Sequence, residues 1–133
     1  MDQRQQAVRE TMLDIANEPF EFGRVDCCLF AASVARRITG TDYGAAFDHT
    51  DEAGAQRYID DAGGLEQLIT KTLGCEPTEA LESLRDGDPV LVDVVGEQMI
   101  GVLAAGVAII KTSAGTLRVY PKRILKGWKL DNA

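Results

Sequence analysis

The stretch Pro19-Phe-Glu-Phe-Gly-Arg-Val-Asp-Cys-Cys-Leu-Phe-Ala-Ala-Ser-Val-Ala-Arg-Arg-Ile-Thr-Gly40 decides the fold. It predicts an α-helix over residues 27–38, because its apolar side chains recur at the spacing of one buried helical face. Those side chains are Cys27, Phe30, Ala31, Val34 and Ile38. Asp26 suits the N-cap, since its short carboxylate can accept from the free amides of the first turn. Gly40 suits a left-handed C-cap.

A cysteine in the first turn of this helix has chemical meaning. The positive end of the helix dipole lowers the pKa of a thiol, and the free backbone amides nearby can stabilise an oxyanion. Asp26, immediately before Cys27, acts in the opposite direction on that pKa. Cysteine is also among the most buried residue types, so Cys27 can equally be read as a small hydrophobic residue of the core.

Three segments together resemble a known family. Phe20-x-Phe22-Gly23-x-x-Asp26-Cys27-x-Leu29-Phe30 resembles the signature of the NlpC-like cell-wall peptidases, which are compact papain-like cysteine hydrolases. Gly87-Asp88 resembles the opening of that family's first strand, and Gly101-Val102-Leu103 followed by Gly106 is similar to its second strand. The resemblance spans about residues 20–128 and is closest to small stand-alone versions encoded among phage tail genes. It implies a papain-like α+β fold with Cys27 as the nucleophile.

The chain departs from this family at the general base. In the active enzymes a histidine opens the second strand, and here that position is Met99. A thioether cannot accept a proton from a thiol, and a nucleophile needs a base within hydrogen-bond reach. Residues 107–112 offer no obvious substitute for the polar residue that orients the histidine. The single histidine of the chain, His49, lies in a polar loop, where we expect a solvated residue rather than a relocated base.

Composition narrows the classes of partner. The 133 residues suit one domain, 1–133, and the 45% hydrophobic and 26% charged content is ordinary for a folded protein. The formal net charge of −7 argues against nucleic-acid binding, which needs a basic surface. Cys27, Cys28 and Cys75 lack the paired spacing of zinc sites, and neighbouring cysteines on a helix rarely bridge. We therefore expect unbridged thiols, no metal and no cofactor.

The remaining pattern predicts helices first and strands second. Further helices are expected over residues 2–17, 51–62 and 65–73, with a short helical turn at 79–85. Strands are expected over 90–95, 99–104, 107–112 and 116–120, with residues 96–98 as a hairpin loop and a final short strand carrying Trp128. This order is typical of an α+β fold in which N-terminal helices pack on a C-terminal antiparallel sheet.

Two functions from different classes are consistent with these features. The first, favoured by Met99, is an inactive NlpC-like protein that acts as an assembly component of a phage tail tip. The alternative is a cysteine peptidase or amidase that cleaves peptidoglycan stem peptides with Cys27. No apolar run of a signal peptide follows the N-terminus, and no stretch approaches the roughly 20 apolar residues of a membrane span. We expect assembly in the host cytoplasm, location in the virion tail, and no membrane insertion.

An assembly protein needs a surface for its partners, which would be other tail proteins in a hetero-oligomeric particle. We expect exposed apolar residues from the loop at 41–50 and the segment at 121–130, because aromatic residues are enriched in interface cores. The candidates are Tyr43, Phe47, Ile124, Leu125 and Trp128. The basic residues Lys122 and Arg123, with Lys126 and Lys129, would complement an acidic partner. The alternative for these lysines is a solvated edge that guards the sheet.

Overall fold

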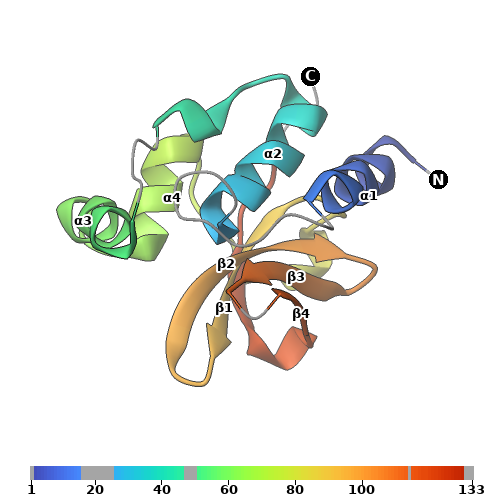
Figure 1. Ribbon diagram of the computed structural model, residues 1–133. Helices are drawn as coiled ribbons and strands as arrows, with labels where there is room; N and C mark the ends of the chain where they lie inside the picture. The colour runs from blue at the N-terminus through green and yellow to red at the C-terminus, as the bar shows by residue number, and fades with distance from the viewer. Residues whose placement is uncertain (1, 16–25, 47–50, 114, 131–133) are drawn as a thin grey trace.

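Four α-helices lie on one side of a five-stranded antiparallel β-sheet in the computed structural model (Figure 1). The structure describes residues 2–15, 26–46, 51–113 and 115–130, and all statements below concern these residues. The helices are α1 (Gln3–Ile15), α2 (Cys27–Thr39), α3 (Glu52–Ala62) and α4 (Leu65–Leu73). The strands are β1 (Pro89–Val94), β2 (Glu97–Ala104), β3 (Val107–Thr112), β4 (Gly115–Val119) and β5 (Ile124–Gly127). The 3-10 turns are η1 (Tyr43–Ala46), η2 (Leu81–Ser83) and η3 (Pro121–Arg123). The predicted α+β class is confirmed.

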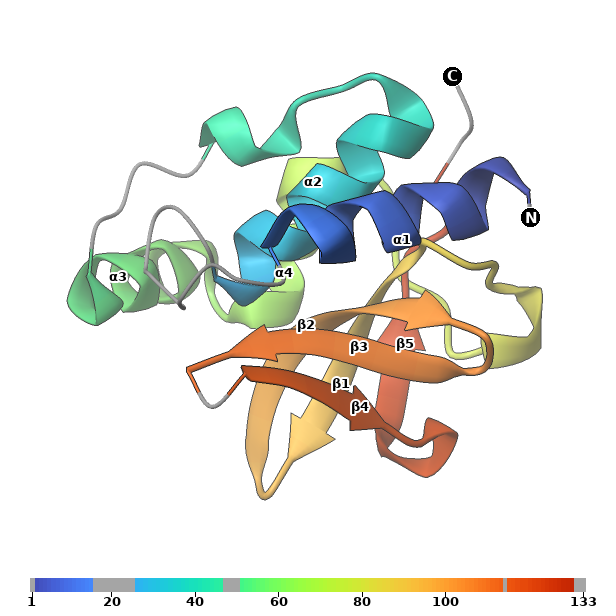
Figure 2. The ribbon, with the colours of Figure 1, turned by 45° about the vertical axis from the view of Figure 1, so that its right-hand side comes forward.

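The sheet has the strand order β4-β3-β2-β1-β5, and every pairing is antiparallel. The first four strands form a meander, and β5 returns past the sheet to pair with β1 (Figure 2). The chain between β4 and β5 contains η3. In both ribbon views this short turn lies at the end of the molecule away from α3.

The hairpin between β1 and β2 corrects one prediction. Its turn is Val95-Gly96, in which both residues have positive φ, and β2 already begins at Glu97. This is the backbone of a type I′ turn, whose twist matches that of the strands it joins. The predicted loop at residues 96–98 was wrong, because valine rarely adopts positive φ and gave no turn signal. The β2–β3 turn repeats the arrangement with Ala105-Gly106.

The central helix α2 forms as its sequence predicts. The Asp26 carboxylate accepts from the Leu29 backbone N–H at 2.9 Å and so caps the first turn. Gly40 ends the helix in the left-handed conformation, with φ of 81°, and its N–H donates to the Arg36 carbonyl. Val34 and Ala35 have no exposed surface. Helix α2 is therefore covered on more than one side, by α1 and by the sheet.

The two faces of the sheet belong to two separate cores. Ile109 packs with the helical core that contains Val34 and Trp128, whereas its neighbours Ala108 and Ile110 pack on the opposite face. Adjacent strand residues point to opposite sides, so this split follows from the alternation along β3. The helical face positions the N-terminal end of α2 against the sheet, where the candidate site lies.

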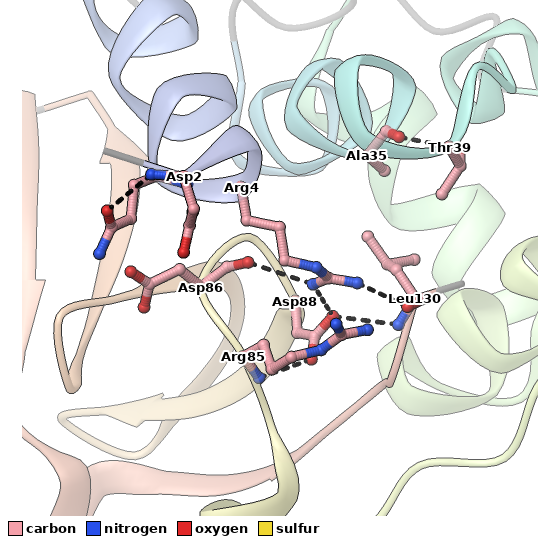
Figure 3. A network of polar contacts seen from close by, with 9 residues as sticks. Asp2, Arg4, Ala35, Thr39, Arg85, Asp86, Asp88 and Leu130 are labelled. Carbon is pink, nitrogen blue, oxygen red and sulfur yellow. Dashed lines mark hydrogen bonds and ion pairs between the residues drawn. The ribbon is translucent and has the colours of Figure 1, made fainter. Parts of the chain in front are cut away.

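A buried ion pair joins the N-terminal helix to the sheet (Figure 3). Arg4, on α1, donates to Asp88 Oδ1 at 2.8 Å, to the Leu130 carbonyl at 2.6 Å and to the Asp86 carbonyl at 3.1 Å. Asp88 also accepts from the backbone N–H groups of Leu130 and Arg85. One carboxylate thus connects α1, the turn before β1 and the C-terminal segment, which explains physically why an aspartate stands at this position.

Candidate functional site

A cavity of about 480 Å³ lies between the N-terminal end of α2, the helices α3 and α4, and the neighbouring ends of β2 and β3. Its volume falls in the range of roughly 300–1,000 Å³ that is usual for small-molecule sites. It is lined by Asp26, Cys27, Cys28, Glu52, Ala55, Gln56, Tyr58, Ile59, Leu65, Leu68, Glu97, Gln98, Met99, Lys111, Thr112 and Ser113. The lining mixes apolar, acidic and hydroxyl side chains, so the cavity suits a ligand with both apolar and polar groups.

Cys27 is the first residue of α2 and lines this cavity, as does Cys28. Both side chains are half-buried, and none of the three cysteines of the chain forms a disulfide. The predicted placement of Cys27 in the first turn of a helix that packs against the sheet is confirmed. Cys27 also contacts the core on the far face of the sheet, so the packing role considered from the sequence is present as well.

The two thiols have opposite pKa shifts. The pKa of Cys27 is lowered, chiefly because the Cys28 thiol donates a hydrogen bond to it, with smaller help from the backbone N–H of Ile100. Burial and the nearby Asp26 carboxylate oppose this shift. The pKa of Cys28 is raised by its hydrogen bond to Cys27 and by burial. Cys27 is therefore the thiol of the pair that loses its proton more readily, and it lines the cavity.

Met99, which the family resemblance places at the position of the general base, lies on β2. Met99 lines the same cavity as Cys27 and contacts the same core cluster. A thioether sulfur cannot take up a proton at any accessible pH, so this side chain cannot activate the thiol. His49 lies outside the residues that the structure describes, and the prediction that it is not the base stays a prediction.

Lys111 is a cavity residue that the sequence reasoning missed. It lies on β3 and is only 7% exposed. Residues 107–112 were expected to offer no obvious substitute for the polar residue that orients the histidine, and Lys111 was not considered as a cavity residue. The alternation of β3 places Lys111 on the same face as Ile109, toward the helices. Applying the period of two to residues 107–112 was the signal that could have found it.

The predicted partner surface is only partly exposed. Leu125, Lys122 and Arg123 are exposed, and Tyr43 is half-buried against the helical core. The expectation that Trp128 and Ile124 are exposed was wrong, since they are 0% and 7% exposed. Phe47 lies outside the described residues.

Long-range contacts explain these errors. The Trp128 indole N–H donates to the Thr70 hydroxyl at 3.1 Å, so α4 covers the tryptophan. Ile124 packs with the core on the far face of the sheet. The Lys126 ammonium pairs with Glu66 at 3.0 Å, and Lys129 is exposed. Tyr120, not singled out from the sequence, is 70% exposed.

Within the described segments, no group of three or more His, Cys, Asp or Glu residues is arranged to hold a metal ion. A search of the same segments finds no helix with the length and apolar character needed to cross a bilayer.

One sequence family covers nearly the whole chain. Residues 1–130 match the family described as "Domain of unknown function (DUF6950)". The chain belongs to this family. A search of curated protein sequences returns no significant match. Membership in DUF6950 assigns no activity, so the chemistry of the cavity and the exposed surface carry the functional argument.

Proposed function

We propose that this chain is a non-hydrolytic protein of the NlpC-like, papain-fold type that serves as an assembly component of a phage tail tip. The observation that carries this proposal is that Met99, at the position of the general base, lines the cavity beside Cys27. Loss of the base from such a pair lowers the rate by orders of magnitude. The protein assembles with other tail proteins in the host cytoplasm and stays in the virion tail.

Three local structures support the NlpC-like assignment. Asp26-Cys27 begins a helix that packs on the sheet, as the family signature implies. Gly87-Asp88 directly precedes β1. Gly101 lies in β2, where a Cβ atom would come within 2.9 Å of the Ile109 carbonyl oxygen, so a glycine is needed for the close approach of β3.

The catalytic half of the proposal is tested with soluble peptidoglycan fragments that carry stem peptides. Purified protein is incubated with them, and products are measured by mass spectrometry, with Cys27→Ala as the matched control. The expected result is that the two proteins release the same background amount of product. Cleavage that requires Cys27 would overturn the non-hydrolytic assignment.

The assembly half is tested on particles produced from the genome that encodes the chain. Quantitative mass spectrometry of purified particles is expected to find the chain in a fixed ratio to the tail proteins. Its absence from intact particles would overturn the assembly role, whatever the hydrolysis assay shows.

A second candidate function has one observation in its favour. The lowered pKa of Cys27, in a cavity of about 480 Å³, is what a cysteine peptidase or amidase acting on stem peptides would need of its nucleophile. The same assays separate the two functions. Turnover that is lost in both Cys27→Ala and Cys27→Ser, in a protein absent from particles, would assign the enzyme.

A further inference from the structure

The charge of the chain is unevenly distributed. Residues 98–130 contain six lysine or arginine residues and no aspartate or glutamate. The rest of the chain holds the other eight cations and all 21 carboxylates, a formal charge of −13. The six cations are Lys111, Arg118, Lys122, Arg123, Lys126 and Lys129. The net charge of −7 therefore conceals a basic region that extends from within β2 to the end of the described chain.

Lys122 and Arg123 differ from Arg37 and Lys126 in their pairing. Lys126 is held by Glu66, and Arg37 is paired with Asp14. Lys122 and Arg123 are exposed, and within the described part of the chain neither takes part in an ion pair. Their charge is thus available to another molecule.

Exposed apolar side chains lie close to these two cations in the sequence. Five large hydrophobic residues of the described chain are exposed, and three of them, Leu117, Tyr120 and Leu125, lie within nine residues of sequence. Tyr120 precedes the two cations and Leu125 follows them, each with one residue between. We call the exposed side chains of Tyr120, Lys122, Arg123 and Leu125 the 120–125 surface. Tyrosine and arginine are the residue types most enriched at the energetic centres of protein interfaces.

The 120–125 surface is presented on a fixed backbone. The Arg123 N–H donates to the Tyr120 carbonyl at 2.9 Å, which closes the η3 turn. Ile124 is 7% exposed and anchors the turn in the core. The Trp128 N–H donates to the Pro89 carbonyl at 2.9 Å and fixes the other end. Little backbone entropy would be lost on binding, because the turn is already ordered.

We infer that the 120–125 surface docks an acidic segment of a different protein chain. This inference rests on the proposed assembly role and names the surface and the chemistry of the partner. The two unpaired cations would fix register and speed the encounter, while Tyr120 and Leu125 supply apolar contact. Nucleic acid is disfavoured as the partner, because the rest of the chain carries a charge of −13. The net charge of −7 on each copy opposes the approach of two copies at long range, and the crosslinked peptide distinguishes a second copy from a different chain.

The test is site-specific photo-crosslinking in cells that express the chain from its own locus. A p-benzoylphenylalanine residue replaces Tyr120, and the crosslinked peptide is identified by mass spectrometry. The matched control places the same residue at Leu13, which is 63% exposed on α1. Charge dependence is measured with Lys122→Glu/Arg123→Glu, and its control is Arg57→Glu/Lys71→Glu, an equal change of charge at exposed positions of α3 and α4.

The expected result is a crosslink from position 120, absent from position 13, to a segment of another protein rich in Asp and Glu. The Lys122→Glu/Arg123→Glu variant should lower its yield about tenfold or more, while the control pair leaves it unchanged. A crosslink only to a second copy, to nucleic acid or to a neutral or basic segment would overturn the inference, as would an unchanged yield or no specific crosslink. If the crosslinked partner is acidic but is not a tail protein, and the chain is absent from purified particles, the docking inference stands and the proposed function is overturned.

Discussion

Replacing Arg4 with methionine should destabilise the fold by about 3–5 kcal/mol, because the change leaves the buried Asp88 carboxylate without its cation. The Arg4 and Asp88 side chains are 5% and 2% exposed, so water cannot readily replace the lost partner. Arg4 also supplies hydrogen bonds to the Asp86 and Leu130 carbonyls, which lose a donor. A domain of this size has a total stability of about 5–15 kcal/mol, so the loss is a large fraction of it.

A second substitution tests whether the uncompensated charge is the cause. In the Arg4→Met background, Asp88→Asn removes the buried charge and keeps one oxygen for the backbone N–H of Leu130 or Arg85. Burying a neutral amide costs less than burying an unpaired carboxylate. The double variant should therefore be about 1–2 kcal/mol more stable than Arg4→Met alone, although neither should reach the stability of the natural chain.

The assay is urea unfolding followed by the fluorescence of the buried Trp128. With a slope of about 2 kcal/mol per molar urea, the Arg4→Met change should lower the midpoint by roughly 2 M. The control is Arg36→Met, because the Arg36 and Asp42 side chains lie 3.9 Å apart and are 65% and 54% exposed. Arg36→Met should change the free energy of unfolding by no more than about 0.5 kcal/mol. A similar cost for both variants, or a double variant less stable than Arg4→Met, would refute the reasoning.

Two further predictions concern the turn before β1 and the thiol pair. Gly87→Ala should lower the free energy of unfolding by about 2–5 kcal/mol, because φ is +91° and the new Cβ would come 2.3 Å from Ile38 Cδ1. Gly96→Ala, whose Cβ would meet no atom within 4 Å, should lower it by about 1–2 kcal/mol in the same unfolding assay. Equal costs would contradict this steric explanation. Iodoacetamide should label Cys27 with a pH midpoint below that of Cys28, and Cys28→Ala should move the Cys27 midpoint upward by removing the donor that stabilises its thiolate. Labelling is measured by peptide mass spectrometry. If the pH midpoint of Cys27 labelling is unchanged in Cys28→Ala, or moves downward, Cys28 does not stabilise the thiolate.

Local signals in the sequence were sufficient to predict α2 and its neighbourhood. The Asp26 cap, the apolar spacing and the glycine at position 40 act within a few residues of one another, and the structure reproduces all three. The same holds for α4, which was expected over residues 65–73 and ends at Leu73 before a left-handed Gly74. The Val95 turn was missed because tertiary pairing of β1 with β2 overrides the preference of valine against positive φ.

The candidate site was harder to predict, because its residues come together only in three dimensions. Cys27 was found from its helix position, but Lys111 reaches the cavity through the register of the sheet. Trp128 was placed on the surface because its sequence neighbours are lysines and a glycine. Its burial depends on Thr70, which lies 58 residues away in sequence. A local pattern carries no information about such a contact.

The residues on which the resemblance to the NlpC-like enzymes depends can be separated by their structural tasks in this chain. The Asp26 carboxylate caps α2, Gly87 adopts a φ of +91° next to Ile38, and Asp88 holds the ion-pair network. Cys27, whatever its reactivity, packs against the core on the far face of the sheet. In the family that the sequence resembles, the general-base histidine serves catalysis, whereas Met99 at the corresponding position lines the cavity with Cys27 and packs against the same core cluster without proton chemistry. The residues of the resemblance that have structural tasks are present and the proposed base is replaced, which is the combination that the proposed assembly role predicts.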